Sequence, residues 1–287
     1  MKNYSIISRK FTIYFLLLGF FLCVMFIVMP ITPLLLDILI PLNESRQRFF
    51  AVEVDSTVNR DKYFLPFHCY TSSIILVGLC ITISVDTMHI VCTAHACSLF
   101  AAISKQIENI VSKRNINDKI SNQCIKLDPL NEEIIYREYI ICIKKHQFVI
   151  EFVNTLESTC QEFTLLLLVL ICGILCLIGL QMIYVLEQMT EAIKFVTLLI
   201  AVLVALLIIC YSGQRLMDES QSIFYRAYAA EWYNFSPRLK SLLIMTLYRS
   251  NVPCGLKAGK MVPLCTVTYA SVIQIAMSYF TTLSSLK

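Results

Sequence analysis

Five long runs of this 287-residue sequence contain no Asp, Glu, Lys or Arg. Each has about the 20 residues that a helix needs to cross the ~30 Å hydrocarbon core of a bilayer. Lipid offers no partners to backbone amides, and barrel strands would be half as long and alternate in polarity, so the runs favour helices. The sequence predicts an all-α integral membrane helical bundle with cytosolic helical extensions, a single membrane domain over 1–287. Its five transmembrane helices are expected at about 11–36, 63–85, 163–186, 195–214 and 261–286.

Composition agrees with a membrane protein and excludes an ordinary soluble domain. The chain is 57% hydrophobic and 15% charged, a larger apolar share than soluble domains carry. The first run ends in Pro30 and Pro33 without a cleavage site and is too long for a signal peptide, so we expect it to remain as a span. Membrane lipids are therefore expected partners, and nucleic acid is not.

The distribution of Lys and Arg predicts the orientation. Of 24 such residues, 18 fall in the N-terminal tail, between spans two and three, and between spans four and five. By the positive-inside rule these segments are cytosolic. The N-terminus is then expected in the cytosol and the C-terminus outside. The sequon at Asn43 falls on the predicted outside and is a candidate glycosylation site.

The predicted cytosolic segments carry helical patterns. Apolar residues from Leu99 to Val111 recur at helical spacing, which predicts that span two continues into the cytosol. A polar loop is expected over 115–131, then a helix over 132–161 that leads into span three. Another amphipathic helix is expected over 218–250, interrupted near Ser236-Pro237. These helices, within about 96–161 and 215–260, either pack into an intracellular anchor bundle or lie on the inner leaflet.

Motifs for catalysis are missing from the sequence, so no enzyme activity and no cofactor are expected. His89 and His95 lie six residues apart, a spacing that does not place two metal ligands on one helical face. Asp86 stands close by near the inner end of span two, where ionisable groups usually face protein or water. Structural polar contacts are favoured over a metal site for these three residues.

The last span is unusually rich in hydroxyl groups. Gln274, Ser278, Thr282 and Leu286 recur every four residues and form a drifting stripe on one face. Such a stripe suits a water-filled pathway with an apolar residue as a gate. Small hydroxyl residues also hold helices together in lipid, and the stripe alone does not separate the two interpretations.

Several segments of the chain resemble insect odorant receptors, and the resemblance covers essentially the whole chain. The most specific part is the final third, and the predicted outer segment 39–46 is also similar to ant and bee members. The residues that carry the resemblance in the final third are Phe224-Tyr225-Arg226-Ala227-Tyr228, Trp232-Tyr233, Pro253-Cys254, Ala258-Gly259-Lys260 and Ser278-Tyr279-Phe280-Thr281-Thr282-Leu283.

The resemblance implies a subunit of a ligand-gated, non-selective cation channel in the plasma membrane. Similar receptors have seven spans with the N-terminus inside and assemble, as tetramers, with an odorant co-receptor. Five spans imply that the first two are lacking here. A small volatile odorant is the implied ligand. The implied pore-lining residues are Ser278, Thr282, Ser285 and Leu286, with Leu286 as a candidate gate.

The family's odorant pocket lies in the outer half of the membrane, and depth alone suggests its residues. These candidates are Phe26, Met29, Phe67, Tyr70, Ile74, Ile178, Met182 and Phe195. The resemblance also implies a subunit interface, for which the candidates are Phe224, Tyr228, Trp232 and Tyr233. Ordinary packing within one subunit is an alternative role for all of these side chains.

Three other functions are kept as alternatives. A truncated fragment that does not conduct is suggested by the missing spans. A membrane receptor that signals through a cytosolic partner would need the opposite placement of at least one terminus. A secondary transporter would show paired, broken spans in related halves, which the sequence does not contain.

Overall fold

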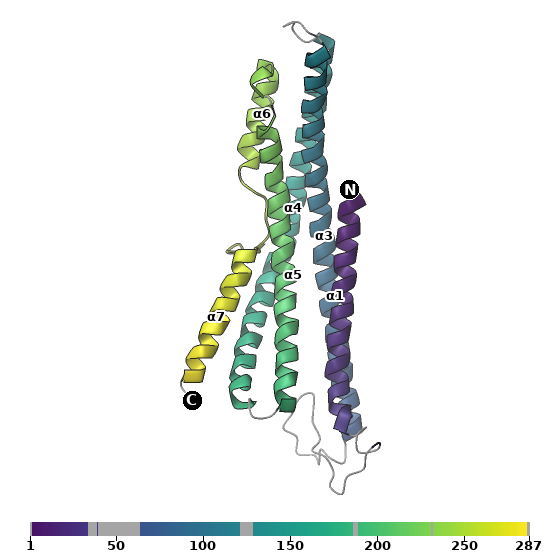
Figure 1. Ribbon diagram of the computed structural model, residues 1–287, viewed down its shortest axis with the longest axis vertical. Helices are drawn as coiled ribbons and strands as arrows, with labels where there is room; N and C mark the ends of the chain where they lie inside the picture. The colour runs from purple at the N-terminus through teal and green to yellow at the C-terminus, as the bar shows by residue number, and fades with distance from the viewer. Residues whose placement is uncertain are drawn as a thin grey trace. The chain divides into compact units, whose positions relative to one another are not determined.

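The computed structural model describes residues 2–33, 39, 64–120, 129–185, 189–230 and 232–285. Among these residues the regular secondary structure is helical except for one short hairpin, so the all-α prediction is confirmed (Figure 1). The elements are α1 (Lys2–Val28), η1 (Met29–Ile31), α3 (Phe64–Ile120), α4 (Pro129–Val185), α5 (Met189–Tyr228), η2 (Trp232–Asn234), α6 (Pro237–Ser250), β1 (Lys257–Ala258), β2 (Val262–Pro263) and α7 (Thr266–Ser285).

The two long helices α3 and α4 confirm that the spans continue into amphipathic extensions. Each has 57 residues without interruption (Figure 1). The polar loop predicted over 115–131 was wrong at both ends, because α3 runs to Ile120 and α4 begins at Pro129. Extending a formed helix costs little, so the polar residues that follow α3's apolar part continue it. Proline fits the first turn of a helix, where its missing N–H is not needed.

Three of the described helices are long and apolar enough to cross a membrane by length and composition. They are α3, α4 and α5, and α1 contains a shorter apolar stretch at Leu16–Met25. A multi-pass membrane protein is thus confirmed, whereas the count of five spans stays a prediction.

The chain forms two compact units. The first unit contains Ile90–Gly173, Leu206–Met277 and the start of α1. The second contains Arg9–His89, Ile174–Ala205 and Ser278–Lys287. The single membrane domain over 1–287 stays a prediction.

The first unit has a continuous hydrophobic core built from parts of α3, α4, α5 and α6. On α3, Phe100, Ile103 and Ile107 are almost fully buried, as the helical spacing predicts. On α5 and α6, Ile223 and Leu243 are buried against them in the same cluster. Burying one such side chain stabilises the folded state by about 1.5–3 kcal/mol. The predicted packed bundle is therefore confirmed as a bundle, while its cytosolic location stays a prediction.

Polar contacts hold the same helices in register. The hydroxyl of Tyr139, itself fully buried, donates to Oγ1 of Thr246 at 3.3 Å, which links α4 to α6. The backbone N–H of Cys254 donates to the Ser220 hydroxyl at 3.0 Å and fixes the segment after α6 against α5. These hydrogen bonds join elements that are far apart in sequence. They hold α6 in one specific position, which apolar packing alone would not fix.

A short hairpin with two residues in each strand follows α6 and contains the only strands of the described residues. Strands β1 and β2 pair antiparallel, and the turn between them places Gly259 and Lys260 at φ 58° and 63°. The Met261 N–H donates to the Ala258 carbonyl at 3.2 Å, so Gly259 and Lys260 are the central residues of a β-turn, and positive φ at both positions is typical of type I′. A Cβ on Gly259 would lie 2.5 Å from Cδ2 of Leu165, and the Gly259 N–H donates to the Gln161 carbonyl at 3.0 Å. The positive φ and the close approach to Leu165 both favour glycine at position 259.

The interruption predicted near Ser236-Pro237 is confirmed. Helix α5 ends at Tyr228, and α6 begins at Pro237 after Ser236 in extended geometry at its N-cap. Proline at the first position sets the helical φ of α6, and the residue before it is forced out of the helical region. The chain can therefore reverse and place α6 beside α5 (Figure 1).

Candidate functional site

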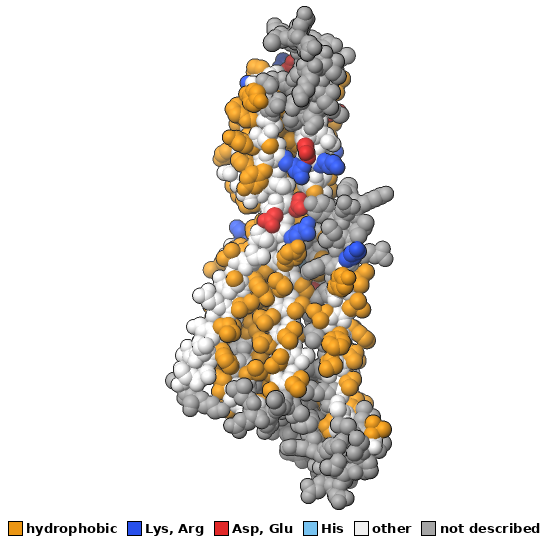
Figure 2. Space-filling view, viewed as in Figure 1, with side chains coloured by type: hydrophobic (Ala, Val, Ile, Leu, Met, Phe, Trp, Pro, Cys, Tyr) orange, Lys and Arg blue, Asp and Glu red, His pale blue; other side chains and the backbone are white. Residues whose placement is uncertain are grey.

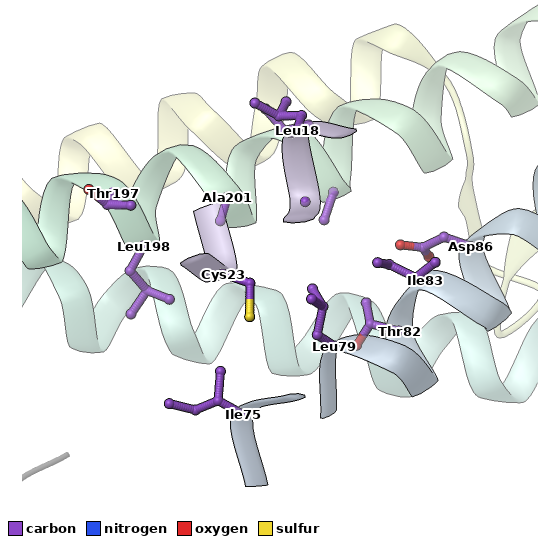
Figure 3. A pocket seen from close by; sticks show the side chains of 13 residues that line it. Leu18, Cys23, Ile75, Leu79, Thr82, Ile83, Asp86, Thr197, Leu198 and Ala201 are labelled. Atoms are coloured by element: carbon purple, nitrogen blue, oxygen red, sulfur yellow. The ribbon is translucent and has the colours of Figure 1, made fainter. Parts of the chain in front are cut away.

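The second unit contains a cavity of about 330 Å³ (Figure 3). Side chains from α1, α3 and α5 surround it, so three segments distant in sequence contribute to one site. Its lining residues are Leu18, Gly19, Cys23, Ile75, Leu79, Thr82, Ile83, Asp86, Thr197, Leu198, Ala201, Val204 and Ala205.

Small residues leave the space that forms this cavity. Gly19 on α1 lies near α3, since a Cβ at Gly19 would be 3.7 Å from Cδ1 of Ile83. On α5, Ala201 and Ala205 occupy one face at i, i+4 spacing and present only methyl groups to the cavity. Larger side chains at these positions would fill the space between the helices.

The lining is almost entirely apolar, with three exceptions. Two of them are threonines whose hydroxyls donate to carbonyls of their own helices: Thr82 to Gly78 at 3.0 Å, and Thr197 to Ile193 at 2.8 Å. The third is Asp86, whose side chain extends from α3 toward the cavity (Figure 3). Asp86 is 4% exposed, and its Oδ2 has no hydrogen-bond partner among the described residues.

The size and lining of the cavity suit a small organic molecule. Ligand pockets are typically about 300–1,000 Å³, mostly hydrophobic, and contain a few polar groups that fix orientation. A closed apolar cavity of about 150 Å³ already accommodates benzene. The cavity beside Asp86 is about twice that size and can hold a larger, mainly apolar compound.

The eight pocket candidates suggested by depth differ from the described residues that line this cavity. Ile178 is buried, Phe67, Met182 and Phe195 are partly buried, and Tyr70 and Ile74 are exposed. The side chains of Phe26 and Met29 lie outside the described residues. All eight stay predictions.

Three pore candidates, Ser278, Thr282 and Ser285, lie in the last part of α7, and no side chain of this helix is buried in the isolated chain. Thr282 and Ser285 are exposed and donate to the carbonyls of Ser278 and Thr282, at 2.9 and 2.7 Å. Their donors are used within the helix, so these hydroxyls present oxygen lone pairs outward. Ser278 is exposed as well, and Leu286 lies outside the described residues.

The aromatic interface candidates cluster around the break between α5 and α6. Phe224 and Tyr228 stack with ring centroids 6.1 Å apart, and Trp232 meets Tyr233 edge-on at 6.3 Å. Tyr228, Trp232 and Tyr233 are exposed. Large exposed aromatic groups are common at protein interfaces, although their role here stays a prediction.

The described residues contain no group of three His, Cys, Asp or Glu side chains that could hold a metal ion. His95 packs edge-on against Phe152, with ring centroids 5.8 Å apart. Asp86 differs, because its carboxyl faces an apolar cavity instead of a polar contact.

Sequence reasoning missed most of the cavity because depth alone cannot say which face of a helix points inward. The available signal was the small residues: Gly19, and Ala201 with Ala205 one turn apart, stand among large apolar neighbours. An ionisable residue beside a membrane span was a second signal. It was noticed at Asp86 but interpreted as a structural contact.

Comparison with known proteins agrees with this architecture. In fold, the chain is similar to the insect olfactory receptor OR5 from Machilis hrabei, solved in complex with eugenol, with a TM-score of 0.65 and 13% identity. That match covers 100% of this chain and 70% of the receptor. Surface exposure of hydrophobic side chains over α5 fits a helix that meets lipid (Figure 2).

Relatives in Drosophila melanogaster are odorant receptors. The chain is 22% identical to Odorant receptor 10a over 283 residues, which is 96% of this chain and 66% of that receptor. It is 23% identical to Odorant receptor 63a over 220 residues, 76% of this chain and 49% of the relative. It covers 38% of Odorant receptor 2a, so it spans less than two thirds of these relatives. The sequence model of the 7tm Odorant receptor family matches residues 2–277, and the chain belongs to that family.

Proposed function

We propose that this chain is an odorant-binding subunit of a ligand-gated, non-selective cation channel that it forms with an odorant co-receptor in the plasma membrane. The observation that carries the proposal is the family match over residues 2–277. In the proposed mechanism, a small volatile compound enters the cavity of the second unit and stabilises an arrangement of helices in which the shared pore conducts.

The cavity supports a role in binding. A ligand shifts a conformational equilibrium only by its difference in affinity for the two states. The lining comes from α1, α3 and α5, so an occupant contacts three helices at once and favours one spacing between them. Small side chains such as Ala201 leave the helices free to close on the occupant.

Helix α7 supports a role in conduction. The hydroxyl oxygens of Ser278, Thr282 and Ser285 would line the pore, with Leu286 as the gate. Because Thr282 and Ser285 already donate to backbone carbonyls, the groups that they offer to a passing ion are lone pairs. Oxygen lone pairs replace part of the hydration of a cation, which fits cation conduction.

The exposed aromatics of the first unit support assembly. Tyr228, Trp232 and Tyr233 expose large apolar groups around the helical interruption between α5 and α6. With Phe224, they are the proposed contacts to neighbouring subunits of a tetramer, where aromatic side chains contribute most of the binding energy. The N-terminus is proposed to lie in the cytosol and the C-terminus outside, with Asn43 as a glycosylation site.

The test is whole-cell current in cells that express this chain with and without an insect odorant co-receptor. The volatile panel should include eugenol, which the Machilis hrabei receptor binds in its solved complex. Odorant-evoked cation current that requires both subunits would support the proposal. Surface-expressed protein that gives no current with any compound would support the alternative of a fragment that does not conduct.

The alternative of signalling through a cytosolic partner makes a different prediction. Current would then start only after a delay and would be lost in excised membrane patches that lack cytosol. A channel subunit would respond in such patches when odorant and co-receptor are present.

A further inference from the structure

The least explained group in the second unit is the carboxyl of Asp86. It is 4% exposed, lies against a cavity of otherwise apolar lining, and keeps Oδ2 without a partner among the described residues. It is also the only carboxyl among the described lining residues. A carboxyl in this position is costly, because burying a polar group without a hydrogen bond forfeits its hydration.

Groups nearby do not remove this cost. The two other lining residues with oxygen in their side chains, Thr82 and Thr197, donate their O–H groups to the carbonyls of Gly78 and Ile193. No Lys or Arg appears among the described lining residues. The remaining lining side chains are hydrocarbons, apart from the thiol of Cys23, which is a weak donor. Among the described lining residues no other side chain offers Asp86 a strong donor, so an occupant of the cavity can supply one.

The geometry places this acceptor where an occupant can reach it. The Asp86 side chain points from α3 toward the lining side chains of α1 and α5 (Figure 3). Its Oδ2 is hidden from bulk solvent but borders a cavity of about 330 Å³. A site with one polar anchor in an apolar chamber selects molecules with a matching polar group at one end of an apolar body.

We propose that Asp86 makes this cavity selective for small, mainly apolar molecules that carry one hydrogen-bond donor, a hydroxyl or a primary amine, which donates to the Asp86 carboxyl. The proposal rests on the proposed function, because it names the ligand class of the same cavity. A molecule of this class gains the hydrogen bond and buries its hydrocarbon against Leu18, Leu79 and Leu198. An apolar molecule of equal shape leaves the carboxyl unpaired.

The size of the preference follows from the free-energy cost of leaving the Asp86 carboxyl unpaired. Sites that hydrogen-bond a ligand hydroxyl discriminate strongly against the analogue without it, because their own polar group is left buried and unsatisfied. We expect the donor-bearing compound to be preferred by at least about tenfold, at the lower end of that effect.

The experiment uses benzyl alcohol, benzylamine and ethylbenzene, three compounds with the same number of heavy atoms. Concentration–response curves of current are measured with the co-receptor present, and thermal stabilisation is measured on the purified full chain. The wild type should respond to benzyl alcohol and benzylamine at concentrations at least about tenfold lower than to ethylbenzene. Stabilisation of the purified chain should follow the same order.

Variants at Asp86 and a matched control show whether the Asp86 carboxyl causes the preference for donor-bearing compounds. Asp86→Leu removes the carboxyl, so the preference for the two donor compounds should disappear while ethylbenzene still acts. Asp86→Asn keeps an acceptor oxygen but no charge, so benzylamine should lose at least about tenfold and benzyl alcohol should keep its advantage. Ser84→Ala, on the same helix but not among the described lining residues, removes an exposed hydroxyl that donates to the Cys80 carbonyl at 2.7 Å and should change the preference less than about twofold.

Two results would overturn this inference but leave the proposed function intact. One is equal potency of the three compounds on the wild type. The other is a preference that survives Asp86→Leu, or that Ser84→Ala removes equally, since the anchor would then be another group or water. Absence of current and of stabilisation with every compound would instead refute the proposed function. Stabilisation in the expected order without current would support the ligand class and count against conduction.

Discussion

Gly213 lies at a tight contact between α5 and the segment that leads into α7. A Cβ at this position would be 2.8 Å from Cβ of Leu264 and would also collide with the Leu264 backbone carbonyl. Leu264 cannot easily move away, because it is 2% exposed and its N–H donates to the Leu256 carbonyl at 2.9 Å. Gly213→Ala therefore forces α5 and the segment around Leu264 apart.

The expected loss can be worked out from two opposing effects. Overpacking a well-packed site costs about 1–3 kcal/mol, and a collision with backbone belongs at the upper end, about 3 kcal/mol. Alanine is better than glycine inside a helix by about 1 kcal/mol. The net destabilisation of Gly213→Ala is about 2 kcal/mol, which corresponds to a fall in Tm of about 4–8 °C at about 2–4 °C per kcal/mol.

Gly173 on α4 provides the matched control. A Cβ there meets no atom within 4 Å in the described structure. In Gly173→Ala, alanine keeps its advantage over glycine in a helix and meets no collision. This variant should therefore be more stable than the wild type by about 0.5–1 kcal/mol. Thermal unfolding of both variants in the same detergent measures the difference. If Gly213→Ala is as stable as Gly173→Ala, that result would contradict the close approach of α5 to Leu264.

Three further predictions follow from the core and from the sequence. Phe100→Ala should cost about 3–5 kcal/mol because Phe100 is fully buried, whereas Phe148→Ala, at a 63% exposed position on α4, should cost little; equal unfolding temperatures would contradict the described core. Leu286→Ala should raise ligand-free current if Leu286 is the gate, and an unchanged basal current would count against that role. Asn43→Gln should abolish a glycan-dependent mobility shift on gels, and a wild type without such a shift would count against an outside location for Asn43.

The helical architecture was largely predictable from the sequence because it depends on local patterns. Uncharged runs of about 20 residues require helices in lipid, and helical spacing from Leu99 to Val111 predicted the extension of α3. The break before Pro237 follows from the geometry of proline. The helix over 115–120 was missed because polar composition was taken as loop, although the preceding helix continues through it.

The candidate cavity was much less predictable, since it depends on contacts between distant segments. Depth in the membrane suggested Tyr70 and Ile74, which are exposed in the isolated chain. Gly19, Asp86 and Ala201 line one cavity only after α1, α3 and α5 have packed together. The periodicity of a single helix cannot predict which residues of other helices share a cavity with it. The hairpin turn at Gly259 was missed for a related reason, because its glycine serves an approach to Leu165 on α4.

The central claim is that odorants act through the cavity of the second unit. Ala201 lines this cavity on α5, whereas Ala192, on the same helix, is not among its described lining residues. The most direct test compares odorant-evoked current for Ala201→Leu and Ala192→Leu, each expressed with the co-receptor and matched for surface expression. We predict that Ala201→Leu fills the cavity and loses most of the response, whereas Ala192→Leu responds like the wild type. An unchanged response of Ala201→Leu across the odorant panel would contradict the claim.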